Sequence, residues 1–222
     1  MSGARTAPDA GRPARLAERM SVVPYIAAWS GEPMVHPRPV RVAFGGGRLG
    51  FPGEDATSYG HDWRGALWAR QFPGQGKGEP RYETVHVQRQ RRAMSDLLCQ
   101  VCGTTTVTGA IGERFLFLVK DVGRPISEGE RTTSPPVCVP CAHIAVRECP
   151  HLVKGHVAAW VRDAVPWGVA GIVHHPYFVR PLPSEGLVDV SYDAPALAWI
   201  LAYRQVVALY GCTPVNLAEL TA

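Results

Sequence analysis

The sequence has no long hydrophobic run. Its longest apolar stretch, from Ala194 to Tyr203, is half of the roughly 20 residues that a helix needs to cross a bilayer, so we expect no membrane span. The first 20 residues also lack the apolar segment of a secretory signal, and we therefore expect a cytoplasmic protein. Thiols stay reduced in that compartment, so the six cysteines favour metal binding over disulfides.

Familiar catalytic motifs are also missing. There is no H-E-x-x-H sequence, no Ser/His/Asp spacing and no P-loop. Residues 45–50 match G-x-G-x-x-G, but Phe51-Pro52-Gly53 breaks the chain where a helix would have to begin. We therefore predict a hairpin turn at residues 45–50 in place of a dinucleotide site.

Lysine is scarce, because only Lys77, Lys120 and Lys154 occur among the 23 basic residues. The formal charge of +4 is compatible with a polyanionic partner but is too small to imply one. The densest basic patch lies within residues 81–92 and consists of Arg81, Arg89, Arg91 and Arg92. This patch is either a solvated surface or a nucleic-acid-binding face.

Residues 87–98 show helical periodicity. Val87 and Met94 fall on one face of the expected helix, and Arg89 and Arg92 fall on the opposite face. Guanidinium groups held on one face suit phosphate oxygens, so we expect these two arginines to be accessible to phosphate or to solvent.

Two cysteine pairs organise the chain. Cys99 and Cys102 form one C-x-x-C motif, and Cys138 and Cys141 form another. Each such turn brings two sulfurs to one side of a tight loop, so the two motifs together can supply a tetrahedral four-sulfur site. We predict a structural Zn²⁺ at these four residues, in preference to a redox pair. Cys149 and Cys212 are left as single buried side chains.

The order of elements around these cysteines resembles the treble-clef zinc-finger group. The first pair is a knuckle, a strand follows at residues 114–120, and the second pair opens a helix within residues 136–149. The resemblance implies a β-hairpin between the two pairs. HNH endonucleases, one branch of the group, carry catalytic His and Asn residues in that interval. Here residues 103–137 contain neither, so the resemblance does not extend to nuclease activity.

A second segment of interest interleaves aromatic residues with arginines. It runs from residue 63 to residue 72 and includes Trp63, Arg64, Trp68, Arg70 and Phe72. The aromatic rings could stack on nucleic-acid bases while the arginines meet phosphates. The alternative is a strand that buries its aromatic side chains in the core.

We expect an α+β fold, mostly of antiparallel strands around the cysteine centre, with a C-terminal helix. The expected strands are residues 22–29, 40–44, 63–72, 114–120, 155–162, 167–174 and 187–192, with a turn at Val165-Pro166. The last helix is expected at residues 195–210, with Asp193 as N-cap and Gly211 at its end. The expected parts are a disordered tail (1–20), an N-terminal β region (21–87), a treble-clef-like zinc module (88–155) and a C-terminal β–α region (156–222), with 21–222 as one compact unit.

These features favour a zinc-structured, non-catalytic binding protein whose partner is a nucleic acid. The alternatives are a protein-interaction module and an enzyme with an unrecognised site. The sequence leaves open whether several histidines take part in a site, namely His61, His86, His143, His174 and His175.

Overall fold

The computed structural model describes residues 20–55 and 60–221. The predicted tail at residues 1–20 lies outside this range, apart from Met20. Strands dominate the described chain, and its two α-helices are α2 (Val87–Ser95) and α3 (Val139–Glu148). The fold is mixed α and β with mostly antiparallel pairing, as predicted. No helix in the described ranges is both long and apolar enough to cross a bilayer.

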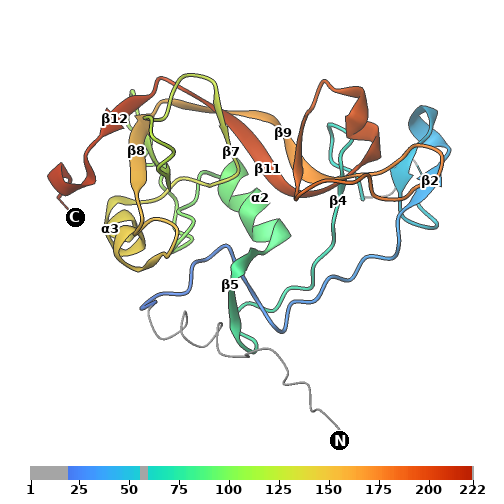
Figure 1. Ribbon diagram of the computed structural model, residues 1–222, viewed down its shortest axis with the longest axis horizontal. Helices are drawn as coiled ribbons and strands as arrows, with labels where there is room; N and C mark the ends of the chain where they lie inside the picture. The colour runs from blue at the N-terminus through green and yellow to red at the C-terminus, as the bar shows by residue number, and fades with distance from the viewer. Residues whose placement is uncertain (1–19, 56–59, 222) are drawn as a thin grey trace, which may run out of the picture.

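The largest sheet of the described chain has five strands and runs along the upper side of Figure 1. Its strands are β4 (Leu67–Trp68), β7 (Glu130–Thr132), β9 (Asp163–Val173), β10 (Val188–Ser191) and β11 (Ile200–Tyr210). β11 pairs antiparallel with β9 and β7 and parallel with β4. β9 also pairs antiparallel with β10, so β9 and β11 form the centre of this sheet.

Three smaller sheets surround it. One contains β12 (Thr213–Val215), β8 (His156–Val161) and β6 (Phe115–Lys120), all antiparallel. The other two are the antiparallel pairs β1 (Ala27–Trp29) with β5 (Pro80–Val85) and β2 (Val40–Val42) with β3 (Arg48–Gly50). The short helices are η1 (Phe44–Gly46), η2 (Pro195–Trp199) and η3 (Leu217–Glu219). The β2–β3 pair confirms a hairpin in this region, but its turn lies at residues 43–47, and residues 48–50 of the predicted turn form β3.

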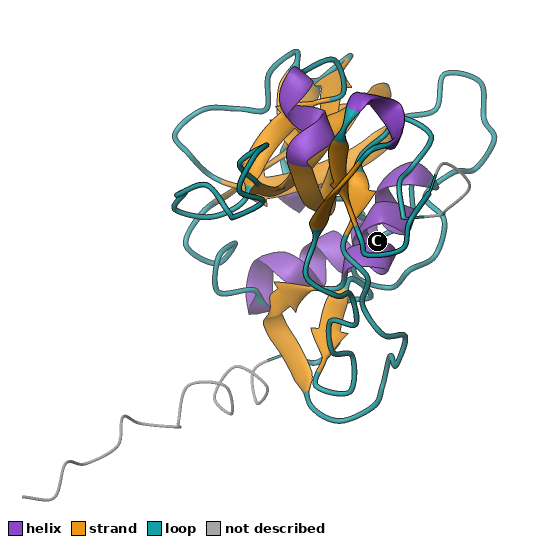
Figure 2. Ribbon diagram, turned by 90° about the vertical axis from the view of Figure 1, so that its right-hand side faces the viewer, coloured by secondary structure: helices purple, strands orange, loops and turns teal. Residues whose placement is uncertain are grey.

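The helix α2 lies between the large sheet and the β1–β5 pair (Figures 1 and 2). Its residue Gln90 is completely buried and attaches the helix to β11. The Gln90 amide donates to the carbonyl of Gln205 at 3.0 Å, and its oxygen accepts from the N–H of Gln205 at 2.9 Å. The pairing of β11 with β9 shifts register between Ala202 and Arg204, just before this point. Gln90 therefore satisfies buried backbone groups beside an irregularity in the ladder.

The predicted C-terminal helix at residues 195–210 is wrong. Residues 195–199 form the short η2, and β11 follows as an 11-residue strand. The apolar residues of β11 are buried on both faces of the strand, so they form a nearly continuous hydrophobic run. Such a run cannot be distinguished from a buried helix by periodicity alone. Ala194, not Asp193, is the N-cap of η2.

The predicted turn at Val165-Pro166 is also wrong, because both residues lie inside β9. The pairing of β9 with β11 shifts register between Val206 and Val207, and Val207 is the partner of Pro166. Proline lacks an N–H and is accepted in strands mainly at edges and bulges. The bulge therefore explains how this proline sits within a central strand.

The β-hairpin that the treble-clef resemblance implies is not formed between the cysteine pairs. Strands β6 and β7 both lie in this interval, but β6 pairs with β8 and β7 pairs with β11. Other elements near the cysteines agree with the sequence analysis. The helix α2, the strand β6 and the helix α3 all form where they were expected.

Candidate metal centre

The first cysteine pair lies in a tight turn after α2. The N–H of Gly103 donates to the carbonyl of Cys99, and the N–H of Cys99 donates to the carbonyl of Thr104, both at 2.8 Å. Gly103 has a φ of +75°, which residues with a side chain rarely adopt. A Cβ at this position would also lie 2.8 Å from the ring of Tyr25. Glycine is therefore required here for its backbone conformation and for its size.

The second cysteine pair opens α3. Cys138 is the N-cap of the helix, and Cys141 lies in its first turn. Pro140 occupies a first-turn position, where a missing N–H costs no helical hydrogen bond. The N–H of Gln100 donates to the carbonyl of Pro136 at 2.9 Å, which ties the first turn to the segment that precedes α3. This backbone contact brings the two pairs together.

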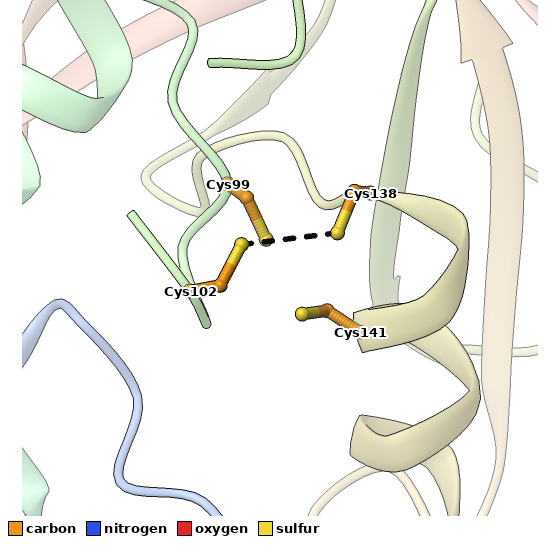
Figure 3. A group of neighbouring side chains, drawn as sticks. All are labelled: Cys99, Cys102, Cys138 and Cys141. Carbon is orange, nitrogen blue, oxygen red and sulfur yellow. Dashed lines mark hydrogen bonds between the residues drawn. The ribbon is translucent and has the colours of Figure 1, made fainter. Parts of the chain in front are cut away.

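The four sulfur atoms converge on one point (Figure 3). All four lie within 4.8 Å of one another, and the Sγ atoms of Cys102 and Cys138 are 3.9 Å apart. A tetrahedral zinc site with Zn–S bonds of about 2.3 Å requires sulfurs about 3.8 Å apart. The observed arrangement fits this requirement, so the cluster can hold a metal ion.

The pKa values of the thiols differ across the cluster. Burial raises the pKa of Cys99 to about 11, and burial and the neighbouring sulfurs raise the pKa of Cys141. Burial also opposes ionisation of Cys102, but hydrogen bonds from Thr104 outweigh it and lower its pKa to about 7. Several thiolates this close repel one another, and a central divalent cation removes that repulsion. The donor set is therefore one that a soft divalent metal would stabilise.

The cluster is embedded in a small hydrophobic core. Cys99 and Cys141 are buried, and they pack with apolar residues such as Val101, Leu116 and Val137. Cys102 is exposed at the surface, and its sulfur lies 2.9 Å from the hydroxyl of Thr104. Thr104 was not predicted from the sequence. The signal that could have identified it is a hydroxyl residue two positions after the second cysteine of a C-x-x-C-G turn, where it can donate to the thiolate.

The structure brings one arginine of the predicted basic patch into the interior. The Arg89 side chain is almost fully buried and forms an ion pair with Glu32, at 2.5 Å. The prediction that Arg89 shares an accessible face with Arg92 is therefore wrong. The buried side of α2 is wide enough to include Arg89 as well as Val87. Burial of its charge is possible because the carboxylate of Glu32 neutralises it.

The other three arginines of the patch stay at the surface. Arg81 lies on β5 and is exposed, and the Arg92 side chain is 69% exposed beside Asp96. Arg91 is half-buried, with its guanidinium 4.4 Å above the ring of Trp68. These three remain candidates for contact with an anionic partner.

The five histidines that the sequence left open have structural contacts. Within the described ranges, none belongs to a cluster that could hold a metal ion. The ring nitrogens contact backbone groups of Leu49 (His61), Phe72 and Arg89 (His86), Leu220 (His143), Ile172 (His174), and Tyr177 and Phe178 (His175).

Comparison of the chain with protein-family models, with curated proteins and with solved structures gave no match. Of the treble-clef resemblance, the structure retains the two cysteine pairs and the helix that begins at the second pair. The function of this centre has to follow from its own geometry.

Proposed function

We propose that Cys99, Cys102, Cys138 and Cys141 bind one Zn²⁺ in a closed structural site, and that the protein is a zinc-structured, non-catalytic binding protein. The convergence of the four sulfurs within 4.8 Å carries this proposal. Four thiolates fill a tetrahedral coordination sphere and leave no position for a reactive water. A site of this kind stabilises the fold instead of acting on a substrate.

The position of the cluster supports a structural role. Cys102 and Cys138 are 36 residues apart in the sequence, so a bound ion would cross-link the turn after α2 to the start of α3. Both segments belong to a small core, and a metal would add binding energy that a core of this size lacks. The N-terminus of α3 would also favour the negative charge of the thiolates of Cys138 and Cys141.

A nucleic acid is the partner that we propose. The accessible arginines Arg81, Arg91 and Arg92 support this, because guanidinium groups bind phosphate oxygens with two parallel hydrogen bonds. Arg89 is no longer part of this set. Phosphate contacts of this kind contribute affinity without reading sequence.

Metal analysis tests the zinc site directly. Protein purified without added metal should contain about one zinc per chain, and Cys99→Ser or Cys141→Ser should lose the zinc and be destabilised together. Cys149→Ser and Cys212→Ser are matched controls that should keep the metal. Equal zinc loss from a control, or iron in place of zinc, would contradict the assignment.

The salt dependence of binding tests the proposed partner. If Arg81 and Arg92 bind phosphates, replacing both by Ala should reduce the salt slope of duplex DNA binding by about 0.9 for each phosphate that is no longer neutralised. The loss of affinity should be nearly equal for unrelated sequences. Binding that is unchanged in the double variant would rule out phosphate binding by these two arginines.

A further inference from the structure

A hollow of about 250 Å³ lies beside the C-terminal half of α2. It collects polar side chains from distant parts of the chain. Asp62 and Arg64 come from the segment before β4, Arg91 from α2, and Tyr192 from the segment after β10. Trp63 stands at the same hollow. The site therefore contains both arginines and aromatic rings.

Arg64 is held in place by aromatic rings. Its guanidinium carbon lies 4.1 Å from the ring centre of Trp63 and 4.5 Å from that of Tyr192. Contacts with ring faces fix a guanidinium without using the N–H groups at its edge. Among the residues that the structure describes, this guanidinium makes no ion pair and donates no hydrogen bond. Its charge and its donors are therefore available to a ligand.

Arg91 is positioned in a similar way. Its guanidinium stacks 4.4 Å above the ring of Trp68, and the Trp68 indole N–H donates to Oδ2 of Asp62 at 2.8 Å. Oδ1 of Asp62 accepts from the N–H groups of Arg64 and Ala66, both at 3.0 Å. Asp62 therefore already accepts three hydrogen bonds. The closest approach of Arg91 to it is 4.0 Å, which is beyond hydrogen-bond distance.

Ser95 and Gln205 also line the hollow, where the Ser95 hydroxyl donates to Oε1 of Gln205 at 2.8 Å. A further polar group is the hydroxyl of Tyr192. Burial, with a further contribution from the charge of Asp62, raises its pKa to about 12. The hydroxyl stays protonated at neutral pH and can donate a hydrogen bond. Two arginines against one aspartate leave the hollow with an excess of one positive charge. This environment suits an anion.

Trp63 provides the second half of the site. It is 85% exposed, which is unusual for so large an aromatic residue. The guanidinium of Arg64 covers one face of the ring, so the other face is open to solvent. An exposed indole beside a fixed guanidinium is the arrangement with which proteins stack an unpaired base and hold its phosphate.

We propose that this pocket binds one nucleotide unit of a single-stranded nucleic acid, with the phosphate at Arg64 and Arg91 and the base stacked on Trp63. The hollow is smaller than the about 300–1,000 Å³ of typical small-molecule pockets, so it accepts the phosphate while the base remains outside. In a duplex the bases are stacked on one another and cannot reach the indole. The inference depends on the proposed nucleic-acid partner and specifies its form.

Fluorescence anisotropy with a labelled oligothymidylate of about 12 nucleotides tests this proposal. The same strand paired with its complement and free thymidine monophosphate serve as competitors. Trp63→Ala and Arg64→Gln should each weaken binding of the single strand about five- to 100-fold. Arg124→Gln removes the same charge from an exposed ion pair elsewhere and should bind as the wild type does. Because Trp63 is exposed, its truncation leaves the core intact, and circular dichroism checks the fold.

The outcomes separate the pocket from the proposed partner. If wild-type binding is weakened by Arg81→Ala and Arg92→Ala but not by Trp63→Ala or Arg64→Gln, the protein binds nucleic acid but the pocket does not contribute. The proposed nucleotide site is then wrong, and the proposed nucleic-acid partner is supported. If the wild type binds neither oligonucleotide at about 100 mM salt, both fail. If the duplex competes as well as the single strand, the proposal that an unpaired base stacks on Trp63 is wrong. If thymidine monophosphate competes as well as the strand, the occupant of the pocket is a free nucleotide, and the proposal that it binds a single strand is wrong.

Discussion

The guanidinium of Arg89 and the carboxylate of Glu32 form a buried ion pair with two hydrogen bonds. Arg89 Nη1 donates to Glu32 Oε1 at 2.5 Å, and Nη2 donates to Oε2 at 2.7 Å. The two residues are only 8% and 3% exposed. The other guanidinium donors bind the carbonyls of Tyr25 and Ala27, both at 2.6 Å. One side chain of α2 thus holds the start of the described chain against the helix.

Breaking this pair should be strongly destabilising. Arg89→Met leaves the Glu32 carboxylate buried without a cation, and we expect the free energy of unfolding to fall by about 3–5 kcal/mol. The double variant Glu32→Gln/Arg89→Met should lose less than the sum of the single variants, because neither charge is then left alone. Urea unfolding measures both effects. Arg92→Met, from an exposed pair, is the control and should change stability by less than about 1 kcal/mol. Strict additivity would show that the two charges do not interact.

The stability of the protein should fall as the pH drops below about 6.5, which is the ordinary pKa of histidine. Burial lowers the pKa of His61, His86 and His174 in the folded protein. The unfolded chain therefore takes up protons first, so stability is retained above pH 6.5 and lost between that pH and the lowered pKa. Each histidine can contribute at most about 1.4 kcal/mol per pH unit.

A variant isolates this effect from any competition between protons and metal. His174→Gln removes one of the three groups, and His174 is not one of the four clustered cysteines but follows β9, where its ring contacts the carbonyl of Ile172. Urea unfolding at pH 7.5 and pH 5.5 should show a smaller pH dependence in this variant than in the wild type. An identical dependence would mean that His174 does not resist protonation.

Gly103 should be intolerant of a side chain. Gly103→Ala strains a backbone with a φ of +75° and places a Cβ 2.8 Å from the ring of Tyr25. Gly112 has a similar φ of +73° but nothing within 4 Å of the added carbon, so Gly112→Ala measures the backbone strain alone. We expect Gly103→Ala to be the more destabilising by about 1–3 kcal/mol. Zinc competition assays should also show weaker metal binding. Equal effects of the two substitutions in urea unfolding would argue against a tight turn at Tyr25.

Removing the metal should lower the melting temperature. A high-affinity zinc chelator should reduce it by more than about 10 °C, because each kcal/mol corresponds to about 2–4 °C in a protein of this size. Added zinc should restore it, and Cys149→Ser should respond as the wild type does. Differential scanning calorimetry provides the measurement. A melting temperature that the chelator does not change would show that the cluster binds no structural metal.

The features that the sequence predicted well depend on residues close to one another in the chain. A C-x-x-C motif closes its own turn, and the helices α2 and α3 show their periodicity within ten residues or fewer. The hairpin turn between β2 and β3 is likewise encoded locally, by three consecutive glycines at positions 45–47, all with positive φ. In these cases the local backbone preferences and the tertiary packing favour the same conformation.

The predictions from the sequence were wrong where contacts with distant parts of the chain outweighed the local pattern of the residues. The residues of β11 are compatible with a helix, but their position between β9 and β7 makes them a strand. Arg89 fits an exposed face by periodicity, yet a carboxylate 57 residues earlier makes its burial favourable. Neither partner can be inferred from the segment itself.

The two candidate sites show the same division. The sequence by itself determined which four cysteines form the cluster that can hold a metal ion, because the spacing within each pair dictates where its sulfurs point. Only the tertiary structure decided that Trp63, Arg64 and Arg91 share a pocket with Tyr192, four residues from three separate segments. A turn is determined by the dihedral angles of a few residues, whereas a pocket forms only after the whole chain has packed around its common core.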